Sequence, residues 1–235
     1  MNSFKTSPFA NIPTVVKNLI IINIIFFIAT LVFNNQPLIQ WFGVFYPDSP
    51  FFRIWQIVTY MFMHGSIGHI FLNMFALFMF GSSLEYVMGP KRFLNFYLLT
   101  GFGALALQFL VQAIEVYGIV GSVHVGGQIS GSITQAQFEK LQEIYRSPMV
   151  GASGAIFGIL IAFGMLFPET ELFLIFFPVP IKAKYFIPLY ILLELYLGIK
   201  QYAGDSVAHF AHLGGALFGF ILIKAWGYKR HDRFL

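Results

Sequence analysis

Six apolar stretches, each near the length of a membrane-spanning helix, constrain the fold of this chain more than any other feature. A helix that crosses a bilayer needs about 20 mostly apolar residues. Charged residues make up only 10% of the 235 residues, against about 25% in soluble domains, so one small core cannot bury the apolar surface. The sequence therefore predicts an all-α polytopic membrane protein with six transmembrane helices, at residues 15–33, 67–86, 93–114, 151–167, 185–197 and 207–226.

The connections between these stretches differ in character. Residues 35–60 contain three prolines and several aromatic residues, which predicts a long amphipathic loop at the membrane interface. Residues 115–148 form a polar, glycine-rich loop, in which residues 135–146 favour a short helix. Residues 171–181 are apolar but short and broken by proline, which indicates a loop or a re-entrant piece. The predicted domains are an N-terminal cytoplasmic segment, a six-span domain and a basic cytoplasmic tail, at residues 1–14, 15–227 and 228–235.

The distribution of cationic residues predicts the orientation in the membrane, because loops rich in Lys and Arg stay on the cytoplasmic side. With six spans both termini lie on one side, and ten of the 14 Lys and Arg residues fall there. We therefore expect cytoplasmic termini and a bacterial inner (plasma) membrane. The modest net charge of +4, without a basic stripe, indicates no nucleic-acid partner. The sequence has no Cys, which excludes disulfides, thiolate metal ligands and a cysteine nucleophile.

Polar residues open the second apolar stretch. His64 comes just before it, and His69 and Asn73 are four residues apart, so they share one face of a helix. Polar groups inside a membrane are costly, and each one suggests a function. His and Asn also form hydrogen bonds between packed helices, which is the simpler explanation for a single residue. Three polar residues at this spacing favour a functional site.

A serine flanked by glycines opens the fourth stretch, where Gly151 and Gly154 surround Ser153. Small residues in a membrane helix usually serve close helix packing, and that explanation suffices for a lone serine. Glycine neighbours also leave a serine oxygen open to a substrate, as a nucleophile requires. The short motif alone is a weak signal.

Two histidines and a pair of glycines open the sixth stretch. His209 and His212 share a helix face, and Gly215 and Gly219 form a seam that lets a partner helix approach closely. A serine hydroxyl becomes a good nucleophile when a base takes its proton, and His is the usual base near neutral pH. We predict Ser153 as nucleophile and His212 as base. No acidic residue is expected beside His212, which favours a dyad over a triad.

The predicted orientation places all three clusters near the outward ends of their stretches, where water for hydrolysis is available. The tetrahedral intermediate of acyl transfer needs hydrogen-bond donors for its oxyanion. The candidate donors are His69, Asn73 and the backbone N–H of Ser153. Glu194 is the only acidic residue well inside a stretch, and a hydrogen bond on the cytoplasmic side is expected to satisfy it.

These clusters, in this order, resemble the rhomboid family of intramembrane serine proteases over about residues 15–227. The resemblance implies a six-helix bundle with a half-submerged first loop and a Ser153–His212 dyad that uses neither a cofactor nor a metal. It implies that His64 supports the cavity or binds water, and it gives His209 a supporting role at most.

The same resemblance implies structural roles for two further residues. Glu85 matches an acidic residue that holds loops together, and Trp55 matches the first residue of a Trp-Arg pair in the first loop. This chain departs from that pair, because Gln56 follows Trp55.

The resemblance also implies the partners, which are the lipid bilayer and single-span membrane proteins whose helices unwind easily near the outer surface. Gly or Pro in such a substrate lowers the cost of extending its helix. The sequence leaves the oligomeric state open.

Three other functions compete with proteolysis. Histidines in or near the spans permit a metal hydrolase, but no HExxH motif occurs and no carboxylate is predicted beside them. A non-catalytic rhomboid-like protein would bind membrane clients without cutting them, yet both Ser153 and His212 are present. A transporter is disfavoured, because the chain lacks repeated halves.

Overall fold

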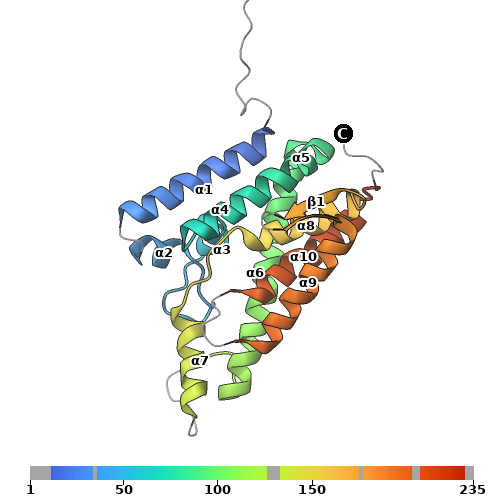
Figure 1. Cartoon of the computed structure of the whole chain (residues 1–235). Helices are drawn as coiled ribbons and strands as arrows, with labels where there is room; N and C mark the ends of the chain where they lie inside the picture. Colours follow the sequence, from blue (N-terminus) through green and yellow to red (C-terminus); the bar gives the residue numbers. More distant parts are fainter. Residues whose placement is uncertain (1–11, 34–35, 126–132, 175–176, 203–206, 231–235) are drawn as a thin grey trace, which may run out of the picture.

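The computed structural model describes residues 12–33, 36–125, 133–174, 177–202 and 207–230, which form a helical bundle with one small hairpin (Figure 1). The rest of the predicted terminal segments, residues 1–11 and 231–235, lies outside the described residues. The helices are α1 (Thr14–Val32), α2 (Gln36–Phe42), α3 (Gln56–Thr59), α4 (Ile67–Ala76), α5 (Ser82–Met88), α6 (Pro90–Val120), α7 (Gln135–Arg146), α8 (Ser153–Leu166), α9 (Ala183–Lys200) and α10 (His209–Ala225). The remaining elements are the 3₁₀ turn η2 (Tyr60–Phe62), the π-helical turn η3 (Leu77–Gly81) and the strands β1 (Glu171–Leu174) and β2 (Phe177–Lys182).

Three helical segments of the described chain are long and apolar enough to cross a membrane. They are α1, the continuous run from α4 through η3 to α5, and α6. Helices α8 and α10 are apolar but shorter. The 14 residues of α8 extend about 21 Å at 1.5 Å per residue, less than the roughly 30 Å hydrocarbon core. The predicted helical bundle is confirmed in outline, and the count of six spans stays a prediction.

Helix α8 lies inside the bundle and packs against α6, α9 and α10. Ten of its 14 residues are buried. Helix α1, by contrast, exposes five isoleucine side chains between residues 21 and 28, as suits a surface that faces lipid. The helix that begins with Ser153 is therefore enclosed by other helices, which makes its short length compatible with a membrane.

The connections confirm one prediction and correct two. Helix α7 forms over residues 135–146, as the sequence predicts. Helix α6 continues to Val120, beyond the predicted end at residue 114, and so shortens the loop that follows. Strands β1 and β2 pair as an antiparallel hairpin where the sequence predicts a loop or a re-entrant piece. A two-stranded ribbon tolerates proline because each of its strands has a free edge.

Glu85 caps the first helix from a distant part of the chain. Helix α1 begins after Pro13, which offers no side-chain cap. The N–H groups of Val15 and Val16 donate to the two carboxylate oxygens of Glu85 at 2.9 and 2.8 Å. A carboxylate at a helix N-terminus satisfies free donors and interacts favourably with the helix dipole. Glu85 thus fastens α1 to α5, whereas the resemblance implies that it joins loops.

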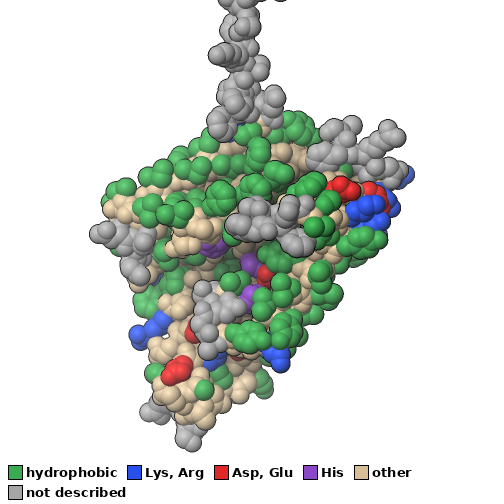
Figure 2. Space-filling view, viewed as in Figure 1, with side chains coloured by type: hydrophobic (Ala, Val, Ile, Leu, Met, Phe, Trp, Pro, Cys, Tyr) green, Lys and Arg blue, Asp and Glu red, His purple; other side chains and the backbone are tan. Residues whose placement is uncertain are grey.

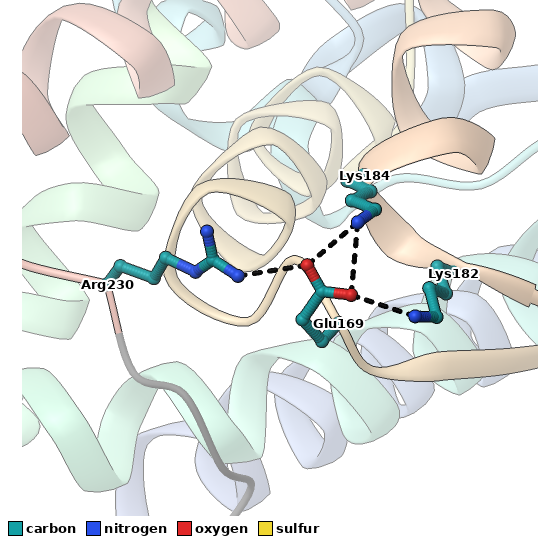
Figure 3. A network of polar contacts seen from close by, with 4 residues as sticks. All are labelled: Glu169, Lys182, Lys184 and Arg230. Carbon is teal, nitrogen blue, oxygen red and sulfur yellow. Dashed lines mark hydrogen bonds and ion pairs between the residues drawn. The ribbon is translucent and has the colours of Figure 1, made fainter.

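Three cations converge on Glu169 at the end of the bundle that carries the hairpin (Figure 3). The carboxylate accepts from Lys184, Lys182 and Arg230 at 2.8, 3.0 and 2.9 Å. Hydrogen bonds from Lys184 and Lys182 lower the pKa of Glu169 to about 2. The network joins the turn after α8 to β2, to the start of α9 and to the segment after α10.

Asp48, in the first loop, anchors the region around α7, which lies at the lower end of the bundle in Figure 1. Tyr145 and the Val125 N–H donate to one carboxylate oxygen at 2.7 and 2.8 Å, and His124 Nδ1 lies 2.9 Å from the other. Burial raises the pKa of Asp48, but these hydrogen bonds outweigh it and leave the pKa below its usual range. The first loop and the loop before α7 are therefore held together.

Candidate active site

Ser153 and His212 lie in hydrogen-bond contact. Ser153 is the first residue of α8, and His212 lies in the first turn of α10. His212 Nε2 is 2.8 Å from Ser153 Oγ. The imidazole stacks on the Phe157 ring, with ring centroids 4.3 Å apart and planes 8° from parallel. This stacking fixes the plane of the ring, so that its nitrogen points at the serine oxygen.

Gly151 shapes the approach to Ser153. Its φ of +129° is a conformation that side-chain-bearing residues rarely adopt. A Cβ added at Gly151 would also lie 2.8 Å from His69 Nε2 and 3.6 Å from Ser153 Oγ. The same space therefore borders both side chains, and His69 lies close to the serine.

Glycines bring α10 against α8. A Cβ added at Gly215 would overlap the carbonyl group of Gly154, and one added at Gly219 would lie 2.6 Å from the Gly158 oxygen. Because backbone atoms cannot move aside as a flexible side chain can, only glycine allows this approach. Gly215 is three residues from His212, and Gly154 directly follows Ser153. The seam thus sets the distance between Ser153 and His212.

Polar donors from α4 border the same region. Asn73 is 6% exposed, and its Nδ2 has no hydrogen-bond partner among the described residues. His69 is half-buried, and its ring centroid lies 5.0 Å from that of the buried His64. Figure 2 shows histidine side chains in a hollow in the middle of the face that it displays, beside atoms of an Asp or Glu side chain. The hollow contains the kind of donors that an oxyanion requires.

Glu194 is the residue of this site that the sequence predictions misplace. It is 4% exposed, and its Oε2 lies 2.8 Å from Nδ1 of His212 and 2.8 Å from Nδ1 of His209. The prediction that no acidic residue lies beside His212 is therefore wrong, as is the prediction of a separate cytoplasmic-side bond. Hydropathy gives the depth of a residue but not the direction in which its helix face points. Helix α9 turns Glu194 toward α10.

The same three residues resemble a ligand set for a metal. One ligand atom each from Glu194, His209 and His212 lies within 4.8 Å of the others. A carboxylate and two imidazoles are ordinary zinc ligands. The prediction that no carboxylate accompanies the histidines is wrong for the same reason as above, and the prediction that the site uses no metal stays a prediction.

Comparison with known proteins decides the family. A rhomboid domain model matches residues 52–229, more than half of the chain. The chain belongs to the rhomboid family. Members of this family are generally intramembrane serine proteases that act on transmembrane substrates within the bilayer.

Rhomboid proteins from several organisms are similar to the chain. RHOMBOID-like protein 12, mitochondrial, of Arabidopsis thaliana is 29% identical over 94% of this chain and 60% of its own length. Rhomboid protein 1, mitochondrial, of Saccharomyces cerevisiae is 28% identical over 76% of this chain and 44% of its own length. The rhomboid protein YdcA of Bacillus subtilis is 25% identical over 77% of this chain and 71% of its own length. The chain thus spans about half the length of the first two relatives.

The relatives correct the predicted location. Four of them, from Arabidopsis thaliana, Schizosaccharomyces pombe and Saccharomyces cerevisiae, are named mitochondrial. These names point to a mitochondrial membrane and contradict the predicted bacterial plasma membrane. The prediction is wrong because a bias of Lys and Arg distinguishes the two sides of a membrane, not one kind of membrane from another.

This rhomboid chain has a buried glutamine, Gln56, in place of the arginine of the expected Trp-Arg pair. Gln56 is 0% exposed, and its Nε2 lies 3.2 Å from the carbonyl oxygens of both Gln40 and Phe51. Its Oε1 accepts from the Arg53 N–H at 2.9 Å. Trp55 is exposed and donates to the Trp41 carbonyl at 2.9 Å. The hydrogen bonds of Gln56 therefore hold the segments of the first loop together without the expected arginine.

Proposed function

We propose that this rhomboid protein is an intramembrane serine endopeptidase with six membrane-spanning helices in a catalytic domain over residues 15–227. Ser153 is the nucleophile and His212 is the general base. The contact of 2.8 Å between Ser153 Oγ and His212 Nε2 carries the proposal, because this geometry lets the imidazole take the hydroxyl proton.

The reaction proceeds in two halves. Ser153 Oγ attacks the carbonyl carbon of the scissile peptide bond, and its proton passes to His212 Nε2. His212 then gives this proton to the leaving amide nitrogen, the C–N bond breaks, and an acyl-enzyme remains. Water attacks the acyl carbon, with His212 taking its proton and returning it to Ser153 Oγ. The carboxyl product leaves, and the dyad is restored.

The oxyanion of each tetrahedral intermediate needs preorganised donors. We assign this role to His69, to Asn73 Nδ2 and to the backbone N–H of Ser153. The unpartnered state of Asn73 Nδ2 among the described residues supports the assignment, because a buried donor without an acceptor is costly unless a substrate supplies one. His64 is assigned a supporting role beside His69.

The substrates are single-span membrane proteins, cut near the side of the membrane opposite to the two termini. Ser153 begins its helix rather than lying at its middle, which supports a cut nearer to the side of the membrane on which α8 begins. A helical peptide bond is shielded by its own hydrogen bonds. Substrates with Gly or Pro near the cut therefore extend at lower cost.

A fluorophosphonate probe, which reacts with activated serines, tests the dyad. The native chain in detergent is compared with Ser153→Ala and His212→Ala, and the labelled residue is mapped by mass spectrometry. We expect labelling at Ser153 in the native chain and about 10²-fold less or none in either variant. Equal labelling of all three proteins would mean that another nucleophile reacts.

A metal hydrolase is the second candidate, favoured by the cluster of Glu194, His209 and His212. Chelation separates the two functions. A serine protease keeps its labelling and its peptide cleavage in the presence of a strong chelator, whereas a metal hydrolase loses cleavage and regains it when zinc is added. A non-catalytic client-binding protein would show neither fluorophosphonate labelling nor peptide cleavage, although it is folded.

A further inference from the structure

We infer that Glu194 is a positioning residue that completes a Ser153–His212–Glu194 triad, with His209 fixing the carboxylate. The inference rests on the proposed serine protease function and deepens it. Its basis is the position of one carboxylate oxygen, Glu194 Oε2, at 2.8 Å from Nδ1 of both histidines.

The hydrogen-bond geometry selects one tautomer of His212. An ionised carboxylate only accepts hydrogen bonds, so Nδ1 of His212 must carry a proton and donate a hydrogen bond to Glu194. The other ring nitrogen, Nε2, is then unprotonated and accepts from the Ser153 hydroxyl at 2.8 Å. This is the tautomer that a general base requires. The opposite tautomer, which the carboxylate of Glu194 disfavours, would present an N–H to the serine and could not take its proton.

The charge of the carboxylate matters as much as its geometry. When His212 takes the serine proton, it becomes an imidazolium ion beside Glu194. Glu194 is 4% exposed and makes no ion pair with a Lys or Arg among the residues that the structure describes. Its negative charge is therefore available to the imidazolium, and a charge-assisted hydrogen bond in a buried site is a strong one. The proton itself stays on the imidazole.

His209 restrains Glu194 from a second direction. It lies one turn before His212 on α10, is 7% exposed, and donates from Nδ1 to the same oxygen. Gly198, four residues after Glu194 on α9, admits this arrangement, because a Cβ there would lie 3.1 Å from the His209 Cβ. Two donors from α10 thus hold one carboxylate from α9 in a single orientation.

The role of Glu194 is tested with the full chain in detergent, using Glu194→Gln and the matched control Glu85→Gln. Both glutamates are 4% exposed and both accept two hydrogen bonds from another helix, so both substitutions weaken a link between helices. Only Glu194 contacts the base. Two quantities are measured: the far-downfield proton signals of hydrogen-bonded imidazoles, and the rate of fluorophosphonate labelling at saturating and at low probe concentrations.

We expect the native chain to show a downfield signal of the His212 Nδ1–H that disappears in His212→Ala and in Glu194→Gln but persists in Glu85→Gln. The corresponding signal of His209 disappears in Glu194→Gln alone. We expect Glu194→Gln to lower the maximal labelling rate per folded molecule by about 10²- to 10⁴-fold, with half-saturation by the probe changed less than about threefold. Glu85→Gln keeps both values once the folded fraction is measured.

Two failures are distinguishable. If the native chain is labelled at Ser153 and Glu194→Gln reacts at the same maximal rate, the dyad stands and the role of Glu194 is overturned. If the folded native chain is not labelled at all, the proposed function fails, and the role of Glu194 in it fails with it.

Discussion

The substitution Gly215→Ala tests how the seam between α8 and α10 sets the reacting distance. The new methyl group would overlap the carbonyl of Gly154, and neither backbone can yield without moving its helix. Over-packing of this kind costs about 1–3 kcal/mol and more where the backbone resists. A separation of the helices by about 1 Å would lengthen the 2.8 Å contact between Ser153 and His212 beyond hydrogen-bond reach. Such a misplacement lowers reactivity by about 10²-fold.

Matched glycine substitutions make this prediction quantitative. Gly219→Ala meets the Gly158 oxygen at 2.6 Å, lies farther from His212, and is expected to destabilise with a smaller loss of labelling. Gly118→Ala on α6 meets nothing within 4 Å, and should stabilise the chain by about 0.5–1 kcal/mol, because alanine loses less entropy in a helix. Thermal unfolding in detergent and the labelling rate per folded molecule measure both effects. Equal stability and labelling of Gly215→Ala and Gly118→Ala would refute the account of the seam.

Three further predictions concern residues away from the reacting atoms. Glu85→Ala leaves the N–H groups of Val15 and Val16 without their cap, and should cost about 1–2 kcal/mol in thermal unfolding while labelling per folded molecule is unchanged. Asp48→Asn removes the charged acceptor of Tyr145 and should lower the free energy of unfolding by about 1–2 kcal/mol. It should also speed limited proteolysis before α7, and an unchanged rate of proteolysis would contradict the anchoring role. Glu169 has a pKa lowered from 4.5 to about 2, so it contributes stability above pH 4.5 that is lost as the pH falls toward 2. Unfolding of Glu169→Gln against pH should lack this acid-dependent loss, and an identical pH profile for the two proteins would count against the network.

The sequence was informative wherever function depends on depth and spacing. Spacing along a helix placed His69 and Asn73 on one face of α4, and the small residues around Ser153 and after His212 indicated a close helix pair. The structure places these elements together, since α8 packs against both α4 and α10. The hydropathy pattern likewise located the helices of the six apolar stretches to within a few residues, except at the end of α6, whereas α2 and α3 form within the predicted first loop.

The sequence was insufficient wherever function depends on the rotation of a helix or on contacts between distant segments. Glu194 lies in an apolar stretch, and its depth alone did not show that its face turns to His209 and His212. One signal was present. Gly198 follows Glu194 by four residues and so lies on the same helix face, and a glycine there indicates that another helix packs closely against that face. The cap that Glu85 provides to α1 joins residues about 70 positions apart, and no local pattern predicts it.

The central claim is that this chain cuts peptide bonds within a membrane by means of Ser153 and His212. Its most direct test is cleavage in proteoliposomes of a single-span protein whose helix is weakened by glycine near one membrane surface. We predict two fragments from the native chain, with the cut near the side opposite to the two termini, no fragments from Ser153→Ala or His212→Ala, and no effect of a chelator. Cleavage that persists in both variants, or that stops only when metal is removed, would contradict the claim.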